Sequence, residues 1–442
     1  MRLIQIFKNI FKIEDLRARL IYTFGIILLY RLGKYVTLPG IDPSQLAGLK
    51  HQTSSGLMGL LDMFSGGAFS QASIFALGIM PYISASIVVQ LLGIVFPYFQ
   101  KLQKEGESGR RKMNQYTRYL TIAVLVLQAP TYLINLAHTL PASAFILGGT
   151  FFQVSSVIIL TAGTMFVMWL GEKITDKGIG NGISLIIMIG IVARMPSNFI
   201  FEAGTRMNGA GGAIALIVEV LFLFIVVLGV ILLVQGTRRV PVQYARRIVG
   251  NKQYGGVRQY IPLKVNAAGV MPIIFAQAIM MLPMIIAGYT NSGSGFVVAF
   301  SNMYGFWYNL VTAILIVVFT YFYTAITINP VQMAEDMKKN GGFIPGIKPG
   351  RKTVEFLDTI MSRITFPGSI FLAIVAIMPS LAVKAGVTPQ FAQFYGGTSL
   401  LILVGVILDT LQQIESHLLM RHYDGLMKSG RVKGRSGSVT SI

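Results

Sequence analysis

The segment from Gly56 to Leu92 reads GLMGLLDMFSGGAFSQASIFALGIMPYISASIVVQLL, and it is apolar without being one ordinary membrane helix. Its first piece, Leu57 to Phe64, is rich in Leu, Met and Phe and stops at Ser65-Gly66-Gly67, where glycine lets the backbone fold back. A piece of this length is too short to cross hydrocarbon, which needs roughly 20 residues at about 1.5 Å each. We therefore expect the chain to re-enter the membrane here and to stop, buried in protein or lining a cavity.

Two phrases of the chain occur twice. GIMPYI at 78–83 is matched by GVMPII at 269–274, and GISLII at 182–187 is matched by GTSLLI at 397–402. The two members of each pair lie five apolar segments apart and end in isoleucine at the same offset. Short matches also arise by chance in apolar sequence, but the agreement in segment number favours a chain built from two related halves.

The composition excludes a soluble globule of this size. Of 442 residues, 53% are hydrophobic and only 12% are charged, and the mean hydropathy is +0.65, which leaves too little polar material to cover a surface. We therefore expect an all-α polytopic membrane protein. The chain has no cysteine, no phrase of the form GxxxxGKS or GxxxxGKT, and four scattered histidines, so we expect no enzyme activity, no metal and no cofactor.

Ten apolar segments are each long enough to cross a membrane. They are residues 20–38, 72–96, 119–138, 151–170, 183–201, 212–235, 266–288, 306–328, 366–383 and 394–413. With this count, all but six of the 37 Lys and Arg residues fall on one face of the membrane. The six exceptions are Arg31, Lys34, Lys50, Arg194, Arg206 and Lys384. Because cytoplasmic loops carry the excess of Lys and Arg, both termini are expected to be cytoplasmic.

Two cytoplasmic loops, 236–265 and 329–365, are longer than a helix connection needs. The first alternates apolar and polar residues on both sides of Asn251, which predicts a hairpin held clear of the membrane. The Gly/Pro-rich middle of the second separates two expected helices. A single basic loop ordinarily follows the topology and touches anionic lipid, whereas two structured basic loops favour docking of a large acidic or RNA-containing partner.

Ionisable residues inside the expected spans are few. Glu219 lies in the sixth span, where a carboxylate costs roughly 2.5 kcal/mol or more, and Asp409 lies near the cytoplasmic end of the tenth. A secondary transporter for a small solute, which also uses inverted repeats and broken helices, is the alternative function. The scarcity of buried charge and the two basic loops argue against it.

An aqueous path through such a chain would be lined by apolar side chains. Ile79 and Ile83 lie four residues apart, on one face of a helix, and the repeat places Ile187, Ile274 and Ile402 at matching depths in three other spans. Branched aliphatic side chains at one level form a hydrophobic constriction that dewets and blocks ions while yielding to a wider object. The alternative for any one of them is an ordinary lipid-facing or helix-packing isoleucine, but the repeat favours a ring.

Long ordered motifs connect the chain with a known family. They are LLDMFSGGAFSQASIFALGIMPYISASIVVQLL at 60–92, DKGIGNGISLI at 176–186, VNAAGVMPIIFAQ at 265–277, FIPGIKPGRKT at 343–353 and YGGTSLLILVGVILDT at 395–410. On these motifs the chain resembles the SecY family, the central subunits of the bacterial protein-conducting channel, over essentially its whole length. The resemblance implies ten transmembrane helices in two inverted, pseudo-symmetric five-helix halves around a central hourglass pore. We expect the halves at 20–203 and 212–413, an amphipathic cytoplasmic helix at 1–19 and a basic cytoplasmic tail at 414–442.

The resemblance also implies roles for particular residues. The family's pore ring falls on the five isoleucines named above. Its plug falls on about 57–69 and includes Leu57, Leu60, Leu61, Met63, Phe64, Gly66 and Gly67. Its lateral gate includes Ser84 and Gln90 in the second span, beside the third, opposite Leu282 in the seventh, beside the eighth. Its docking residues in the two basic loops are Arg238, Arg239, Arg246, Arg247, Lys348 and Arg351.

A passive channel is the activity that the resemblance implies. Unfolded secretory polypeptides with signal sequences would cross the bacterial cytoplasmic membrane, and apolar segments would leave sideways into lipid. The implied partners are the ATPase SecA, the ribosome through rRNA contacts, the small membrane subunits SecE and SecG, nascent polypeptides and anionic lipids. Three features depart from the family pattern: Lys348, where an arginine with bidentate geometry is usual, Glu219, and the Gly-rich segment 204–212.

Overall fold

The computed structural model describes residues 13–46, 49, 59, 62–146, 149–209, 212–244, 247–249, 252–254, 258–277, 279–280 and 302–428. Several predictions of the sequence fall outside these ranges. They concern most of the amphipathic helix at 1–19, the end of the basic tail, the plug residues Leu57, Leu60 and Leu61, the docking residue Arg246 and the gate residue Leu282.

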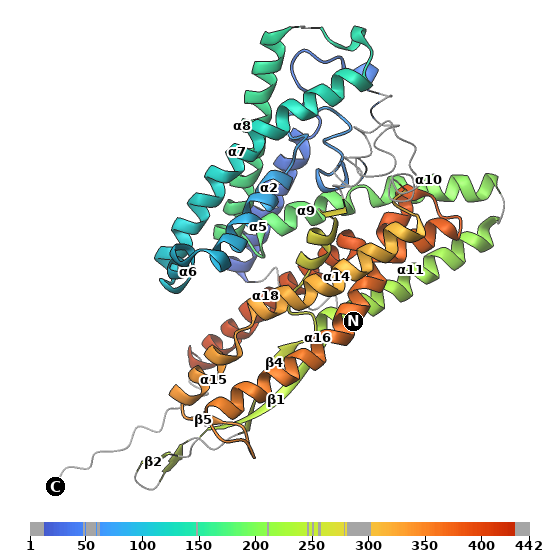
Figure 1. Cartoon of the computed structure of the whole chain (residues 1–442). Helices are drawn as coiled ribbons and strands as arrows, with labels where there is room; N and C mark the ends of the chain where they lie inside the picture. The colour runs from blue at the N-terminus through green and yellow to red at the C-terminus, as the bar shows by residue number, and fades with distance from the viewer. Residues whose placement is uncertain are drawn as a thin grey trace. The chain divides into compact units, whose positions relative to one another are not determined.

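The chain divides into two compact units, Met1–Arg194 together with Gly405–Ile442, and Met195–Val404. The first unit contains α2 (Glu14–Gly33), η1 (Pro43–Gln45), α5 (Met80–Val95), α6 (Pro97–Lys104), α7 (Glu107–Thr139), η2 (Ala142–Ala144), α8 (Thr150–Lys177) and α9 (Gly182–Val192) (Figure 1). The second contains α10 (Met195–Asn208), α11 (Gly212–Gln235), α14 (Phe306–Thr327), α15 (Pro330–Lys339), α16 (Arg351–Lys384), α17 (Pro389–Ala392), η3 (Gln393–Tyr395) and all the strands. Helix α18 (Gly397–Lys428) begins in the second unit and continues in the first.

Helices occupy each of the ten apolar segments that the sequence predicts to be spans. Within the described part of the chain, seven helices are long and apolar enough to cross a membrane, and the count rises to eight if α5 and α6, bent by 102° at a short break, form one span. The seventh expected span is helical at 271–277, and the first is occupied by α2.

The second span begins later than the apolar pattern predicts. The prediction places its start at residue 72, but residues 65–79 form successive turns and α5 begins at Met80. The reason is local, because Gly78 adopts a positive φ of 54° that ends the preceding turn, and Pro81 in the first turn of α5 favours a helix start there.

The internal repeat is visible in the backbone. Gly78 and Gly269 both have positive φ, of 54° and 64°, and a helix starts two residues later at Met80 and at Met271. The second pair of phrases behaves alike, since α9 starts at Gly182 and α18 starts at Gly397. The repeated phrases are therefore helix starts, which explains why their glycines recur.

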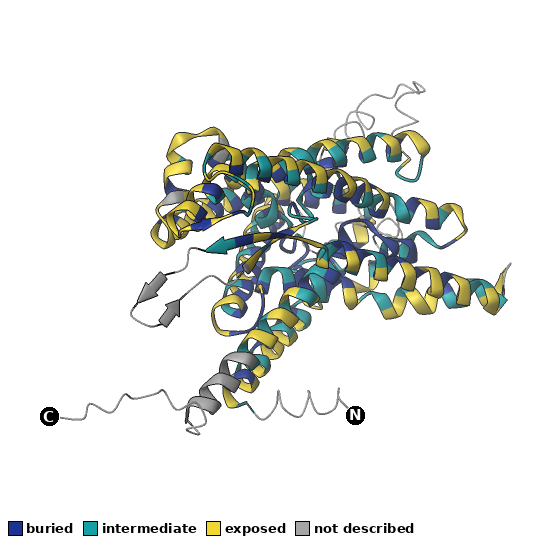
Figure 2. Ribbon diagram, turned by 90° about the horizontal axis from the view of Figure 1, so that it is seen from below, coloured by how far each residue is buried: buried dark blue, intermediate teal, exposed yellow. Residues whose placement is uncertain are grey.

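Helix α11 shows what solvent surrounds the long helices. Its buried residues form one stripe at helical spacing, Glu219, Leu223, Val226, Val230 and Leu233. The rest of its surface is apolar and exposed, with Ile214 at 77% and Leu232 at 72% relative exposure. Figure 2 shows that long stretches of the other helices are likewise coloured as exposed. A helix that is apolar all round, with its surplus exposed, is suited to hydrocarbon and not to water.

The two basic loops build a small domain of their own. Strand β1 (Thr237–Tyr244) pairs antiparallel with β4 (Arg258–Lys264) and, on its other edge, with β5 (Gly342–Phe343). Strands β2 (Arg247–Val249) and β3 (Lys252–Tyr254) pair around Asn251, so the predicted hairpin is confirmed. The two helices predicted for the second loop, 329–365, are confirmed too: they are α15 and the amino-terminal part of α16.

This domain has its own apolar core. Val240 and Val242 of β1 pack with Met337 of α15 and with Leu357 and Met361 of α16. The core resembles that of a water-soluble domain, because apolar residues alternate with exposed ones along β1. The two loops thus form one packed platform, whose core fixes the backbone that carries the surface side chains.

Glu219, which the sequence left without an explanation, has a partner. Arg206 of α10 forms an ion pair with Glu219 of α11. It forms a second ion pair with Glu202, in which Arg206 Nε lies 3.2 Å from Glu202 Oε1. Glu202 accepts hydrogen bonds from the backbone N–H and the hydroxyl of Thr388, and the Tyr395 hydroxyl donates to the backbone carbonyl of Glu219 at 2.9 Å. One guanidinium therefore offsets two carboxylates and ties α10 and α11 to the segment between α16 and α18.

We expect Arg206→Met to lower the stability of the protein, because it leaves Glu202 and Glu219 buried without their cation. Breaking a buried pair from one side costs about 3–5 kcal/mol. The midpoint of thermal unfolding in detergent measures the loss. The matched control is Lys384→Met, since Lys384 is an exposed cation near the end of α16; equal shifts for the two variants would contradict a structural role for the cluster.

Candidate functional site

The re-entrant segment lies deep in the first unit. Every described residue from Asp62 to Ser70 is buried, with Met63 at 2% and Phe64 at 7% exposure. Phe69, near its end, packs into a core formed with Leu133 of α7 and Leu160 of α8. Full burial of a Met or Phe side chain is worth about 1.5–3 kcal/mol relative to water, so the burial of Met63 and Phe64 helps to hold the segment.

The predicted fold-back at Ser65-Gly66-Gly67 is confirmed. Gly66 and Gly67 have positive φ of 66° and 86°, which glycine adopts without strain. The turn is closed by two backbone hydrogen bonds, from Gly66 N–H to the Met63 carbonyl at 3.0 Å and from Gly67 N–H to the Asp62 carbonyl at 2.7 Å. Gly66 and Gly67 are thus required because other residues rarely adopt this backbone conformation.

The turn touches α9 backbone to backbone. A Cβ built on Gly190 would lie 3.1 Å from Gly66 Cα, and a Cβ built on Gly66 would lie 3.0 Å from Gly190 Cα. Such approaches are closer than ordinary Cβ contacts allow. Gly190 therefore sets how deeply the segment enters the unit.

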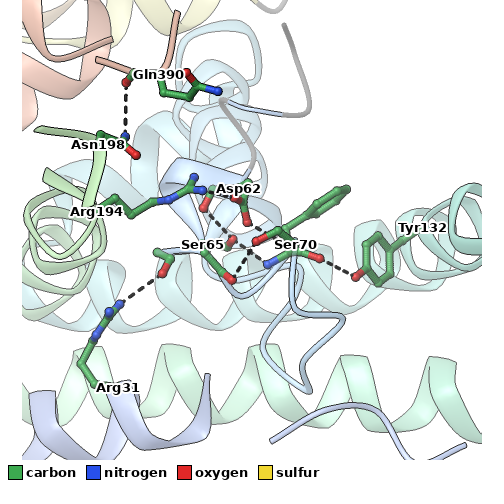
Figure 3. Close-up of polar contacts among 11 residues, drawn as sticks. Arg31, Asp62, Ser65, Ser70, Tyr132, Arg194, Asn198 and Gln390 are labelled. Atoms are coloured by element: carbon green, nitrogen blue, oxygen red, sulfur yellow. Dashed lines mark hydrogen bonds and ion pairs between the residues drawn. The ribbon is translucent and has the colours of Figure 1, made fainter. Parts of the chain in front are cut away.

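Side chains from α2 and α7 satisfy backbone carbonyls of the segment (Figure 3). The Tyr30 hydroxyl of α2 donates to Ser65 O at 3.2 Å. Arg31 Nη1, also from α2, donates to Gly66 O at 3.2 Å. The Tyr132 hydroxyl of α7 donates to Phe69 O at 3.0 Å. These bonds meet the requirement that non-helical backbone at membrane depth be satisfied by protein.

Asp62 is the charged member of the segment. Its side chain is fully buried, and Oδ1 accepts the backbone N–H of Ser70 at 2.8 Å. Oδ2 lies 2.6 Å from Nη2 of Arg194, the second residue after the end of α9 (Figure 3). One carboxylate therefore both closes the segment on itself and connects it to its surroundings.

The five isoleucines of the predicted ring lie near helix starts. Ile79 caps α5 and is 1% exposed, Ile83 is half-buried in the first turn of α5, and Ile187 is 5% exposed in α9; all three belong to the first unit. Ile274 and Ile402 are half-buried and belong to the second unit. The meeting of all five at one level stays a prediction.

The gate and docking residues that the structure describes are accessible or half-buried. Ser84 is half-buried and Gln90 is exposed, both on α5. The docking residues Arg238 and Arg239 on β1, and Lys348 and Arg351 beside the start of α16, are exposed. Arg247 lies in β2. Four exposed cations thus lie on the platform built by the two loops.

The expected plug range 57–69 includes Asp62 without giving it a role, and the sequence pattern does not assign Arg194 or Gly190 to this site. Arg194 and Arg31 enter the sequence analysis only as exceptions to the charge bias between the two faces. These exceptions are a signal that could have found the site, because Lys and Arg are rare on the non-cytoplasmic face, so a Lys or Arg that lies there is expected to have a specific partner.

Three comparisons with known proteins agree with this architecture. A family model described as SecY matches residues 73–411. The protein translocase subunit SecY of Corynebacterium glutamicum is 44% identical over 438 residues, covering 95% of this chain and 98% of that protein. A solved structure on how the plug domain of SecY stabilises the closed channel and maintains a membrane seal aligns with a TM-score of 0.58 and 17% identity, over 90% of this chain and 92% of that one. Sec61 in a canine ribosome–channel complex aligns with a TM-score of 0.58 and 16% identity over the same shares.

We expect Gly190→Val to displace the Ser65-Gly66-Gly67 turn from its contact with α9, because the added side chain would overlap the backbone of Gly66. The chain has no cysteine, so Ser70→Cys, at a position only 6% exposed, reports on the segment alone. The measured quantity is its rate of reaction with a water-soluble maleimide, which should rise several-fold. The control is Gly204→Val in α10, where a Cβ meets nothing within 4 Å; an unchanged rate in the Gly190 variant would show that the turn does not depend on this contact.

Proposed function

The chain belongs to the SecY family of protein translocase subunits, and from that premise we propose how it conducts polypeptides and with which partners. It is a subunit of a protein-conducting translocation channel and not an enzyme. We propose that unfolded secretory chains cross through it and that their apolar segments leave sideways into lipid, because a long apolar helix gains several kcal/mol by partitioning. The pathway is passive, and the driving energy comes from a partner.

The observation that carries the closed-state proposal is the buried segment from Asp62 to Ser70. It is held by side-chain hydrogen bonds to its carbonyls, by apolar packing and by one ion pair, and none of these is covalent. Such a segment can leave its seat and return. We propose that it is the plug of this channel, in the closed position.

The isoleucine ring is the second part of the proposal. Ile79 and Ile83 lie at a helix start that the repeat duplicates at Ile274, and Ile187 and Ile402 lie in the second turn of two helices with matching starts. Equivalent helices of inverted halves run in opposite directions, so equal distances from their starts bring the five side chains to one level when those starts lie near the middle of the membrane. Isoleucine offers no hydrogen bond to a passing backbone, so a ring of them would seal against ions without holding the polypeptide.

A small-solute transporter is not favoured. Family membership speaks for a polypeptide channel, and Glu219, the acidic residue within a described span that drew attention in the sequence, is paired with Arg206 inside its own unit. A carboxylate committed to an arginine is not arranged to bind a transported ion.

We propose that the platform of β1, β4, β5 and α15 is the cytoplasmic docking surface. Its exposed cations suit the phosphates of rRNA or an acidic protein face, and the packed core beneath fixes the backbone that carries them. The ribosome and SecA are the proposed drivers, and SecE and SecG are the proposed small subunits in the membrane. The proposed location is the bacterial cytoplasmic membrane, with both termini cytoplasmic and anionic lipid near the basic loops. Signal sequences would enter at the gate near Ser84 and Gln90.

Replacing Ile83 and Ile402 with Asn should hydrate the constriction and raise the resting ion conductance of reconstituted channels. A tenfold rise would correspond to removal of about 1.4 kcal/mol from the barrier. The control is Ile158→Asn, since Ile158 on α8 is 63% exposed and would face lipid. Conductance no higher than in the control would remove the ring from the proposal.

Reversing Arg238 and Arg239 to Glu should weaken ribosome binding and flatten its salt dependence, because each lost phosphate contact lowers the slope of log affinity against log salt by about 0.7–0.9. Titration of ribosomes onto the channel in liposomes, at several salt concentrations, measures both quantities. Lys384→Glu is the control, as it makes the same change at an exposed position on the opposite predicted face. Ribosome binding with an unaltered slope would return the two arginines to lipid contact.

A further inference from the structure

Three cationic side chains surround the turn of the plug. Arg31 donates to the carbonyl of Gly66, and a Cβ built on Gly67 would lie 2.8 Å from Lys34 Nζ and 3.8 Å from Arg194 Nε. These three cations are half of the six that the topology places on the non-cytoplasmic face. A face that is otherwise depleted in Lys and Arg therefore concentrates them at one turn.

Asp62 supplies the carboxylate for this group. It is buried, with Oδ2 at 2.6 Å from Arg194 Nη2, while Oδ1 accepts from Ser70 N–H and its carbonyl accepts from Gly67 N–H. Loss of its charge would leave the three cations facing a neutral turn. Loss of Arg194 would leave a buried carboxylate without its ion-pair partner, which is the costlier of the two conditions.

We propose that Asp62 and Arg194 form a latch that selects the closed position of the plug, a role that rests on the proposed function of the chain as a channel. The hydrophobic effect that holds the segment is non-directional, so it does not by itself determine one depth or orientation of the plug. A buried ion pair is directional, and its Coulomb gain is largely cancelled by desolvation. Both charges regain water when the plug moves into an aqueous path, so the latch specifies the closed state while opposing opening only weakly.

The place of Arg194 connects the latch to the pore. Arg194 directly follows the α9 cap residue Ala193, and α9 carries the ring residue Ile187 and the seat residue Gly190. A displacement of α9 by an entering chain would therefore move Ile187, Gly190 and Arg194 together. Arg31 and Lys34 act on the same turn from α2 and from the residue after it.

The test compares Asp62→Asn, Arg194→Gln, the double variant and Arg194→Lys in the full chain, purified with its membrane subunits and reconstituted in planar bilayers. Resting ion conductance without a preprotein is the first readout, and maleimide labelling of Ser70→Cys is the second. Asp42→Asn and Lys384→Gln are the controls, since they remove the same charges from a half-buried and an exposed position on the same predicted face. Preprotein translocation at the wild-type rate shows that each variant is folded.

We expect Asp62→Asn and Arg194→Gln each to raise resting conductance about tenfold, equivalent to about 1.4 kcal/mol in the balance between closed and open plugs. The double variant should leak no more than Arg194→Gln alone, because it removes the unpaired carboxylate, and Arg194→Lys should stay close to wild type. Ser70→Cys should become reactive in the leaking variants only.

Wild-type conductance and protected Ser70→Cys in both single variants would overturn the latch. Effects that multiply in the double variant would overturn it too, because they would mean that the two residues act independently. In either case, a raised ion conductance in the Ile83 and Ile402 variants would still support the proposed function as a channel. Failure of the wild-type chain to import any preprotein would instead overturn the proposed function.

Discussion

The requirement that backbone at membrane depth be hydrogen-bonded without water governs the structure around the plug. Residues 62–79 are mostly not helical, yet they lie inside a unit of apolar helices. Their carbonyls are satisfied by tight turns and by donors from α2 and α7, of which Tyr30, Arg31 and Tyr132 are examples. The polar groups that would be costly in hydrocarbon thus become the points at which the segment is held.

The charges on the depleted face follow the same logic. Arg31, Lys34 and Arg194 gather at the plug turn, and Arg206 lies between two carboxylates in the second unit. In both places a cation organises several segments that are distant in sequence. A buried pair contributes little net stability against its desolvation, but it specifies one arrangement, and a membrane protein whose helices slide easily in lipid benefits from such specification.

The cytoplasmic platform obeys different physics. Its core of Val240, Val242 and Leu357 forms in water, where apolar burial drives folding, and β1 alternates exposed and buried residues from Arg239 to Val242. The same chain therefore contains apolar helices whose exposed surface suits lipid and a domain whose exposed surface suits water. The boundary between them lies within α16. This helix begins at Arg351, contributes Leu357 to the platform core and continues as a membrane span.

The amino-acid sequence alone determined the number of spans, the re-entrant turn at Ser65-Gly66-Gly67, the repeat of helix starts and the hairpin around Asn251. These features depend on hydrocarbon thickness, on glycine and proline conformation and on alternation, all of which act within one continuous stretch of at most about 20 residues. Tertiary structure alone decided that Asp62 meets Arg194, that Gly66 lies against Gly190 and that Arg206 neutralises Glu219. Those contacts join different helices and loops, and which side chains meet is chosen by how the helices pack, a property that no local pattern encodes.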